Sequence, residues 1–304
     1  MIHLPAVLLN ALQYVPQGWT VHAVHGLENA PLLRQAPELQ PAIADRSLQF
    51  RLLSAVGVTE YRVGRAWYNA MVLSNAFWSA FTARSLLLFE SDSAFCPRPT
   101  RPLLSFAGYA FVGAPWSAHR DMFFPAWCRN LDSCVGNSGF SLWRRDIMQN
   151  VTSRPPSDYA GMVARYVRKH RGSPSKQGKP GDREALNVLK NGSFDGVPPQ
   201  YASHVDVWFT IVLQSLVHNG YLSVPAVPSS TVASRFSVET LYNESSPWVP
   251  VGMHKAHVYL PQAQLQSLLL RCPTMQVIID ARAASAFAKD KSSKSKATSR
   301  SRHG

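Results

Sequence analysis

Apolar residues along the chain fall into short runs, and polar or turn-forming residues interrupt them. Apolar runs of about four to eight residues bounded in this way are typical of buried β-strands. They predict strands over residues 19–25, 48–53, 85–89, 109–112 and 237–241. The third run, SLLLF, leads directly into the acidic segment ESDS at residues 90–93.

Segments with helical spacing of apolar residues separate these runs. The longest predicted helix covers residues 65–81 and carries large apolar side chains from Trp67 to Phe81. Further helices are predicted over residues 143–151, 206–219 and 262–270. Alternating strands and helices predict an α/β fold around a mainly parallel central sheet. Ligands of such sheets bind at the carboxyl ends of strands, so we expect a site after residues 85–89 and 109–112.

The 304 residues predict one domain over residues 1–284 and a disordered basic tail over residues 285–304. Within the domain, the segment GSPSKQGKPGDR at residues 172–183 predicts a flexible basic loop, because it combines glycine, proline and serine with charge. Hydrophobic residues make up 46% of the chain, which supports a buried core and excludes a globally disordered protein.

The formal net charge of +13 first suggests a nucleic-acid or anionic-membrane partner. Its distribution weakens that interpretation. Residues 165–183 carry a net charge of +6 and residues 285–304 a net charge of +5, which leaves +2 on the rest of the chain. Since the body is nearly neutral, we expect no specific nucleic-acid partner.

Four cysteines are too few for a disulfide scaffold, and none forms the paired spacing of a zinc ribbon. A Cys128–Cys134 bridge is open, but free thiols are the favoured interpretation. No run of about 18 apolar residues is present, so we expect no transmembrane segment. The localisation stays undetermined: the Golgi lumen if an upstream anchor is missing from this chain, and the cytoplasm otherwise.

Two carboxylates, Glu90 and Asp92, stand one residue apart where an apolar strand ends. A hard divalent cation takes oxygen ligands, and one or two carboxylates suffice when it also contacts a diphosphate. Continued extension would point both side chains the same way. The alternative is a solvated strand end or a helix cap.

Three later segments offer further chemistry. In the segment 136–141, GNSGFS, small residues allow a ligand to approach the backbone, although a plain turn explains them equally well. Asp206 could act as a general base or only cap the helix that begins there. His254 could complete the shell of a cation, and Lys255 could neutralise phosphate.

Seven segments in this order resemble the uncharacterised GT-A-type glycosyltransferase-like domain family, described as nucleotide-diphospho-sugar transferases. They lie at residues 67–78, 86–96, 109–116, 136–143, 205–209, 233–240 and 250–255. The resemblance implies a Rossmann-like GT-A fold with a mainly parallel central sheet, either complete or lacking its first strand. It also implies transfer of a sugar from a UDP- or GDP-sugar donor to a hydroxyl acceptor on a glycan or glycoprotein.

The resemblance assigns roles to individual residues. Asp92, Glu90 and His254 would hold Mn²⁺ or Mg²⁺, and Asp206 would be the catalytic carboxylate. The substrate-binding positions would be Trp116, Gly136, Asn137, Ser138, Gly139 and Lys255.

This chain departs from the family pattern at several points. It starts after the usual first strand, Ser138 replaces a glycine, and Val205 replaces an acid. An inactive sugar- or nucleotide-binding module of the same fold is therefore the alternative, and a nucleic-acid-binding protein a weaker one.

Overall fold

The computed structural model describes residues 4–58, 65–117, 134–170 and 205–280. The predicted loop at 172–183 and the predicted tail at 285–304 lie outside these ranges. Within the described ranges, none of the helices combines the length and the apolar character needed to cross a membrane.

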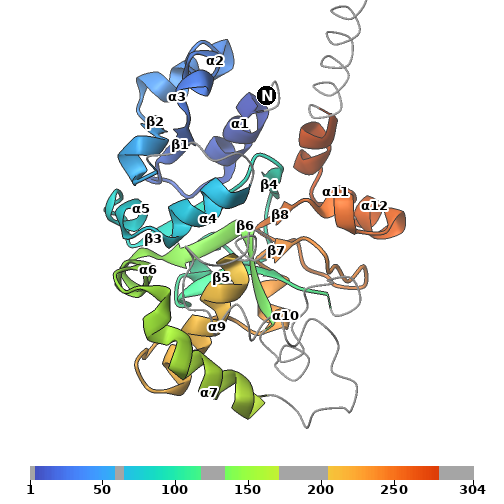
Figure 1. The fold of residues 1–304 in the computed structure, drawn as a ribbon. Helices are drawn as coiled ribbons and strands as arrows, with labels where there is room; N and C mark the ends of the chain where they lie inside the picture. Colours follow the sequence, from blue (N-terminus) through green and yellow to red (C-terminus); the bar gives the residue numbers. More distant parts are fainter. Residues whose placement is uncertain (1–3, 59–64, 118–133, 171–204, 281–304) are drawn as a thin grey trace, which may run out of the picture.

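The N-terminal part is built on a parallel pair of strands, β1 (Val21–His25) and β2 (Leu48–Leu52), in which Val21 lies opposite Leu48. Alternate residues of β1 are buried, as the apolar pattern requires for one packed face. The helices of this part are α1 (Leu4–Tyr14), α2 (Ala30–Arg34) and α3 (Gln40–Ala44). One-turn 3₁₀ segments here are η1 (Leu27–Asn29), η2 (Pro37–Leu39) and η3 (Leu53–Val56). Figure 1 shows this part in blue at one end of the molecule.

The second sheet has the strand order β3-β6-β5, with β3 (Ser85–Phe89), β6 (Val135–Arg144) and β5 (Phe111–Pro115). Both outer strands run antiparallel to β6. Nearly every residue of β6 is buried, so this strand is covered on both faces. Figure 1 shows β6 in the middle of the molecule, between the N-terminal part and α9 (Val205–His218).

The third sheet has the strand order β4-β8-β7, with β4 (Ser93–Phe95), β8 (Gly252–His254) and β7 (Ser237–Val238). β4 pairs antiparallel with β8 and places Ser93 opposite His254, whereas β7 pairs parallel with β8. The sheet therefore joins the chain directly after the acidic segment to the chain around His254.

The predicted mainly parallel central sheet is wrong. The described sheets are small and mostly antiparallel, and only the pairs β1–β2 and β7–β8 are parallel. A buried strand is an apolar run whether its neighbours are parallel or antiparallel, so the apolar pattern does not show the direction of the strands. The segment 136–139, whose glycines suggested a turn, is extended and belongs to β6.

The predicted helices are largely confirmed, with two changes. The helix predicted over 65–81 is divided at Ser74 into α4 (Arg65–Leu73) and α5 (Asn75–Ser79), because Ser74 has an extended backbone. The helix predicted from residue 143 begins at Arg145, since the two preceding residues end β6. The other helices are α6 (Arg145–Thr152), α7 (Ala160–His170), α10 (Ser230–Ala233), α11 (Ala256–Tyr259) and α12 (Gln262–Arg271), with 3₁₀ segments η4 (Leu103–Phe106) and η6 (Pro156–Tyr159).

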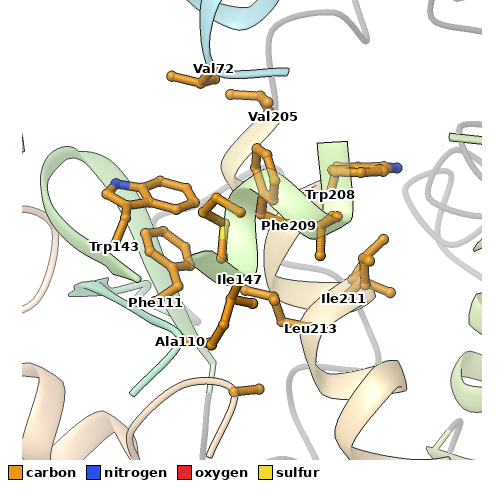
Figure 2. Close-up of a cluster of buried hydrophobic side chains, with 14 of the residues drawn as sticks. Val72, Ala110, Phe111, Trp143, Ile147, Val205, Trp208, Phe209, Ile211 and Leu213 are labelled. Carbon is orange, nitrogen blue, oxygen red and sulfur yellow. The ribbon is translucent and has the colours of Figure 1, made fainter. Parts of the chain in front are cut away.

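The main core lies between α9 and the β3-β6-β5 sheet. Figure 2 shows Phe111 and Trp143 from the sheet facing Phe209 from α9. The rings of Phe111 and Trp143 stack with their centroids 3.8 Å apart, and Trp143 is fully buried. Thr210 donates a hydrogen bond of 3.0 Å to the Val135 carbonyl, which fixes α9 along β6. This packing holds the first turn of α9, and with it Asp206, beside the second sheet.

The prediction of free thiols is wrong. Cys96 at the end of β4 is disulfide-bonded to Cys272 after α12, across a sequence separation of 176 residues. Cys134 is also disulfide-bonded. Cys128, with which the sequence left a bridge open, lies outside the described residues. No cysteine of the described part has a free thiol. A pairing this distant in sequence cannot be deduced from cysteine spacing.

Candidate functional site

The turn between β3 and β4 and the end of β8 meet between the second and third sheets. Glu90 and Asp92 lie in the turn between β3 and β4, and His254 is the last residue of β8. Backbone hydrogen bonds fix the turn: Glu90 N–H donates to the Gly139 carbonyl at 2.8 Å, and Lys255 N–H donates to the Asp92 carbonyl at 3.2 Å. The acidic segment, β6 and the end of β8 are thus held by main-chain contacts.

The side chains of this point form a candidate metal group. His254 Nε2 lies 3.4 Å from Glu90 Oε2 and 3.3 Å from Asp92 Oδ1. Within the described residues, these three are the group of His, Cys, Asp and Glu side chains whose atoms lie close enough together to hold one ion. The three residues assigned to a metal from the sequence are therefore brought together.

The donor set fits a divalent cation. Ligand atoms about 2.1 Å from a six-coordinate ion lie about 3 Å apart when they are neighbours, close to the two separations seen here. Two carboxylates and one imidazole suit Mn²⁺ better than Mg²⁺, which rarely takes imidazole, and Zn²⁺ accepts the same atoms.

The other ring nitrogen of His254 faces two acceptors. His254 Nδ1 lies 3.0 Å from Glu239 Oε1 and 3.1 Å from Asn137 Oδ1. Asn137 Oδ1 also accepts a hydrogen bond from Gly139 N–H at 3.0 Å, so its carbonyl side faces the ring. Glu239 is buried and was not identified from the sequence as a site residue. It stands 15 positions before His254, and no ligand spacing marks it.

Gly139 is required by this packing. A Cβ built there would lie 2.2 to 2.4 Å from atoms of the His254 ring, much closer than van der Waals contact allows. The glycine thus makes room for His254 instead of forming a turn. Gly136, at φ +136°, has a similar role against Thr210 of α9.

Lys255 is paired with the acids. Its Nζ lies 3.1 Å from Glu90 Oε2 and 3.7 Å from Asp92 Oδ2. The residue adopts a left-handed backbone at φ 49°, where the chain turns from β8 into α11. The ammonium group therefore sits at the candidate metal group, where it can also meet an anionic ligand.

The charges around His254 and Glu90 stabilise their ionised forms. Burial alone would lower the pKa of His254, but hydrogen bonds to Asp92, Glu239 and Glu90 outweigh it and raise the pKa well above its usual value. Burial alone would raise the pKa of Glu90, yet the hydrogen bond and charge of His254 and the charge of Lys255 lower it. Opposite charges thus balance within the group.

The surroundings of Asp206, in contrast, favour its neutral form. It is half-buried in the first turn of α9, and its Oδ1 accepts a hydrogen bond from Val207 N–H at 2.9 Å. Burial raises the pKa of Asp206 to about 7, and repulsion from Glu239 and Glu90 adds to the effect. A carboxylate with a pKa near neutrality can exchange a proton with a ligand hydroxyl.

A cavity of about 1330 Å³ connects these groups. Most of the predicted site residues lie on its wall, namely Glu90, Trp116, Asn137, Ser138, Gly139, Asp206, His254 and Lys255. Asp92 and Gly136 are buried behind the wall. The cavity continues past β3 to His22 and His25 on β1 and to Arg51 on β2. Its volume exceeds the range of about 300 to 1,000 Å³ typical of small-molecule pockets, so it can hold a large ligand or two ligands together.

The fold and the site define a mixed α/β protein with a buried carboxylate–histidine group on the wall of a large cavity. The chain belongs to the family described as "Protein of unknown function (DUF5672)", whose match covers residues 58–254. That match includes the candidate metal group and ends at His254. Comparison with curated proteins and with solved structures yields no match.

Proposed function

We propose that the protein is a metal-dependent glycosyltransferase that moves a sugar from a nucleotide-diphospho-sugar to a hydroxyl acceptor. One observation carries the proposal: a group suited to a divalent cation, the ammonium of Lys255 and the carboxylate of Asp206 meet at one large cavity. The resemblance of the sequence segments to nucleotide-sugar transferases supports the same assignment.

The proposed chemistry assigns a task to each group. Glu90, Asp92 and His254 would hold the cation, which supplies positive charge where the diphosphate leaves. Lys255 adds a positive charge next to them. In an inverting reaction, Asp206 takes the proton of the acceptor hydroxyl, which its pKa of about 7 allows near neutral pH.

The donor-binding part is tested by thermal unfolding with Mn²⁺, Mg²⁺ or Zn²⁺ and a panel of UDP- and GDP-sugars. A bound donor raises the midpoint, and the rise grows with the logarithm of its concentration over its dissociation constant. We expect one donor class to raise the midpoint only when a divalent cation is present. Absence of any shift across the panel would reject nucleotide-sugar binding.

The reaction is tested by following release of the nucleoside diphosphate from the donor that binds. We expect slow hydrolysis by the wild type, and its loss in Asp92→Asn, which removes one charged ligand of the group. The matched control is Asp280→Asn, an exposed aspartate near the end of the described chain. Equal loss in both variants would contradict a specific role for Asp92.

The second candidate is a catalytically inactive module that binds a nucleotide or a sugar. One observation favours it: Lys255 and the charged form of His254 both pair with the two carboxylates, so the group is neutralised without a cation. This candidate predicts that a nucleotide sugar stabilises the protein equally with and without metal, and that no nucleoside diphosphate is released.

A further inference from the structure

We infer that Glu239 is a positioning residue that orients His254 and selects the ring tautomer presenting Nε2 to a metal ion. The inference rests on the metal site of the proposed function and adds a residue to it. Nothing in the spacing of the sequence singles out this glutamate.

The first step is the geometry of the ring. His254 Nε2 faces Glu90 and Asp92 at 3.4 and 3.3 Å, so this nitrogen is the one that belongs to the candidate metal group. His254 Nδ1 faces Glu239 Oε1 at 3.0 Å on the opposite edge. A neutral imidazole carries a proton on one nitrogen and a lone pair on the other. Without a metal the acids around the ring favour the form protonated on both nitrogens, and a bound cation would displace the proton of Nε2. The proton that stays on Nδ1 then leaves the lone pair of Nε2 for the cation.

The second step is the choice between the two acceptors near Nδ1. Asn137 Oδ1 lies 3.1 Å away, but it already accepts a hydrogen bond from the Gly139 amide. Glu239 offers a charged acceptor, and hydrogen bonds to charged groups are about twice as strong as neutral ones. Metal-bound histidines commonly donate their second N–H to a carboxylate in this way. Glu239 is thus the stronger of the two restraints on the ring.

The third step is that Glu239 does not itself belong to the group of ligands. Within the described chain, the atoms that lie close enough together for one ion come from Glu90, Asp92 and His254. Glu239 is 4% exposed and lies in the segment just after β7, which is hydrogen-bonded to β8. The parallel pairing of β7 with β8 therefore brings the carboxylate to the far side of the ring.

The test measures metal affinity and the protonated ring nitrogen in the full chain. Mn²⁺ binding is titrated by the loss of the free-ion electron paramagnetic resonance signal for the wild type, Glu239→Gln and Glu239→Leu. Loss of an outer-shell partner typically lowers metal affinity about 10- to 100-fold, and we expect this for Glu239→Leu. Glutamine keeps an acceptor oxygen at the same position, so we expect Glu239→Gln to lose less than about tenfold. Glu244→Gln, an exposed glutamate five positions further, is the control and is expected to bind as the wild type does.

The tautomer is read from ¹⁵N–¹H correlation spectra of histidine-labelled protein saturated with Zn²⁺, which is diamagnetic and binds imidazole, with the His254 signal assigned from His254→Gln. We expect the proton on Nδ1 in the wild type and in Glu239→Gln. A proton on Nε2 of the wild type would overturn the inference, and this measurement needs no variant at position 239 to fold. Unchanged Mn²⁺ affinity and tautomer in Glu239→Leu would overturn it as well.

Three further outcomes distinguish failure of this inference from failure of the proposed function. If Glu239→Gln loses Mn²⁺ as completely as Asp92→Asn does, Glu239 is a direct ligand and the positioning role is wrong. If the wild type shows no saturable Mn²⁺ binding, the metal-dependent function and this inference fail together. If the wild type binds Mn²⁺ and all Glu239 variants bind equally, only this inference fails.

Discussion

Replacing Gly139 by alanine tests the close packing on which the candidate metal group depends. The added Cβ would lie 2.2 to 2.4 Å from three atoms of the His254 ring. Non-bonded carbon atoms normally lie about 3.5 Å or more apart, so the ring must move away by roughly 1 Å or more. It cannot retreat freely, because Glu239 and Asn137 hold its Nδ1 at 3.0 and 3.1 Å.

Two magnitudes follow from this geometry. Overpacking of a dense interior typically costs about 1–3 kcal/mol, so we expect the free energy of unfolding to fall by that amount in Gly139→Ala. Displacing His254 also moves Nε2 away from Glu90 and Asp92. Loss of an outer-shell partner lowers metal affinity about 10- to 100-fold, and displacement of a ligand should weaken Mn²⁺ binding at least as much.

The assay combines urea unfolding with Mn²⁺ titration by electron paramagnetic resonance. Gly108→Ala is the matched control, because a Cβ at that glycine meets nothing within 4 Å. We expect the control to bind Mn²⁺ as the wild type does and to be unchanged or up to about 1 kcal/mol more stable. Mn²⁺ affinity within about twofold of wild type in Gly139→Ala would refute the claim that this glycine makes the site possible.

Three further predictions concern stability. In the folded protein the pKa of Asp206 is raised to about 7 from its ordinary value of 3.8. Its protonation therefore stabilises the fold fully below about pH 4, and this stabilisation is lost as the pH rises through 7. Asp206→Asn should remove this loss of stability with rising pH, which is worth at most about 4 kcal/mol and less for a half-buried group. Parallel curves of unfolding midpoint against pH for the variant and the wild type would contradict this prediction. Replacing Cys96 and Cys272 together by serine opens a loop of 176 residues and should lower the free energy of unfolding in urea by about 2–5 kcal/mol. An unchanged midpoint would show that the bridge does not stabilise the fold. Trp143→Ala removes a fully buried ring stacked on Phe111 and should lower the free energy of unfolding, followed by circular dichroism, by about 3–5 kcal/mol. A loss below about 1 kcal/mol would contradict the packing of this ring between the sheet and α9.

Much of the local structure could be predicted from the sequence, because local patterns encode it. The strand at 85–89 and the helix that begins near Asp206 are confirmed. The acidic pair and His254, assigned to a metal through the resemblance, do meet in space. The assignment of a metal and of a reaction to them stays a prediction.

The remainder depends on contacts between distant segments, which no local pattern carries. Strand direction in the β3-β6-β5 sheet is decided by pairing partners, and the Cys96–Cys272 bridge by the path of the whole chain. Gly139 looked like a turn residue because its true neighbour, His254, is far away in sequence. Glu239 was missed for the same reason, since only the pairing of β7 with β8 brings it to the ring.

The pairing of β4 with β8 has a consequence for the order of events during synthesis. Glu90 and Lys255 are 165 positions apart, so the group cannot assemble until the ribosome has released almost all of the described chain. Closing so long a loop is an entropic step that slows folding. Nascent or C-terminally truncated chains would therefore lack the candidate metal group, and under the proposed function Mn²⁺ uptake would report completion of the fold.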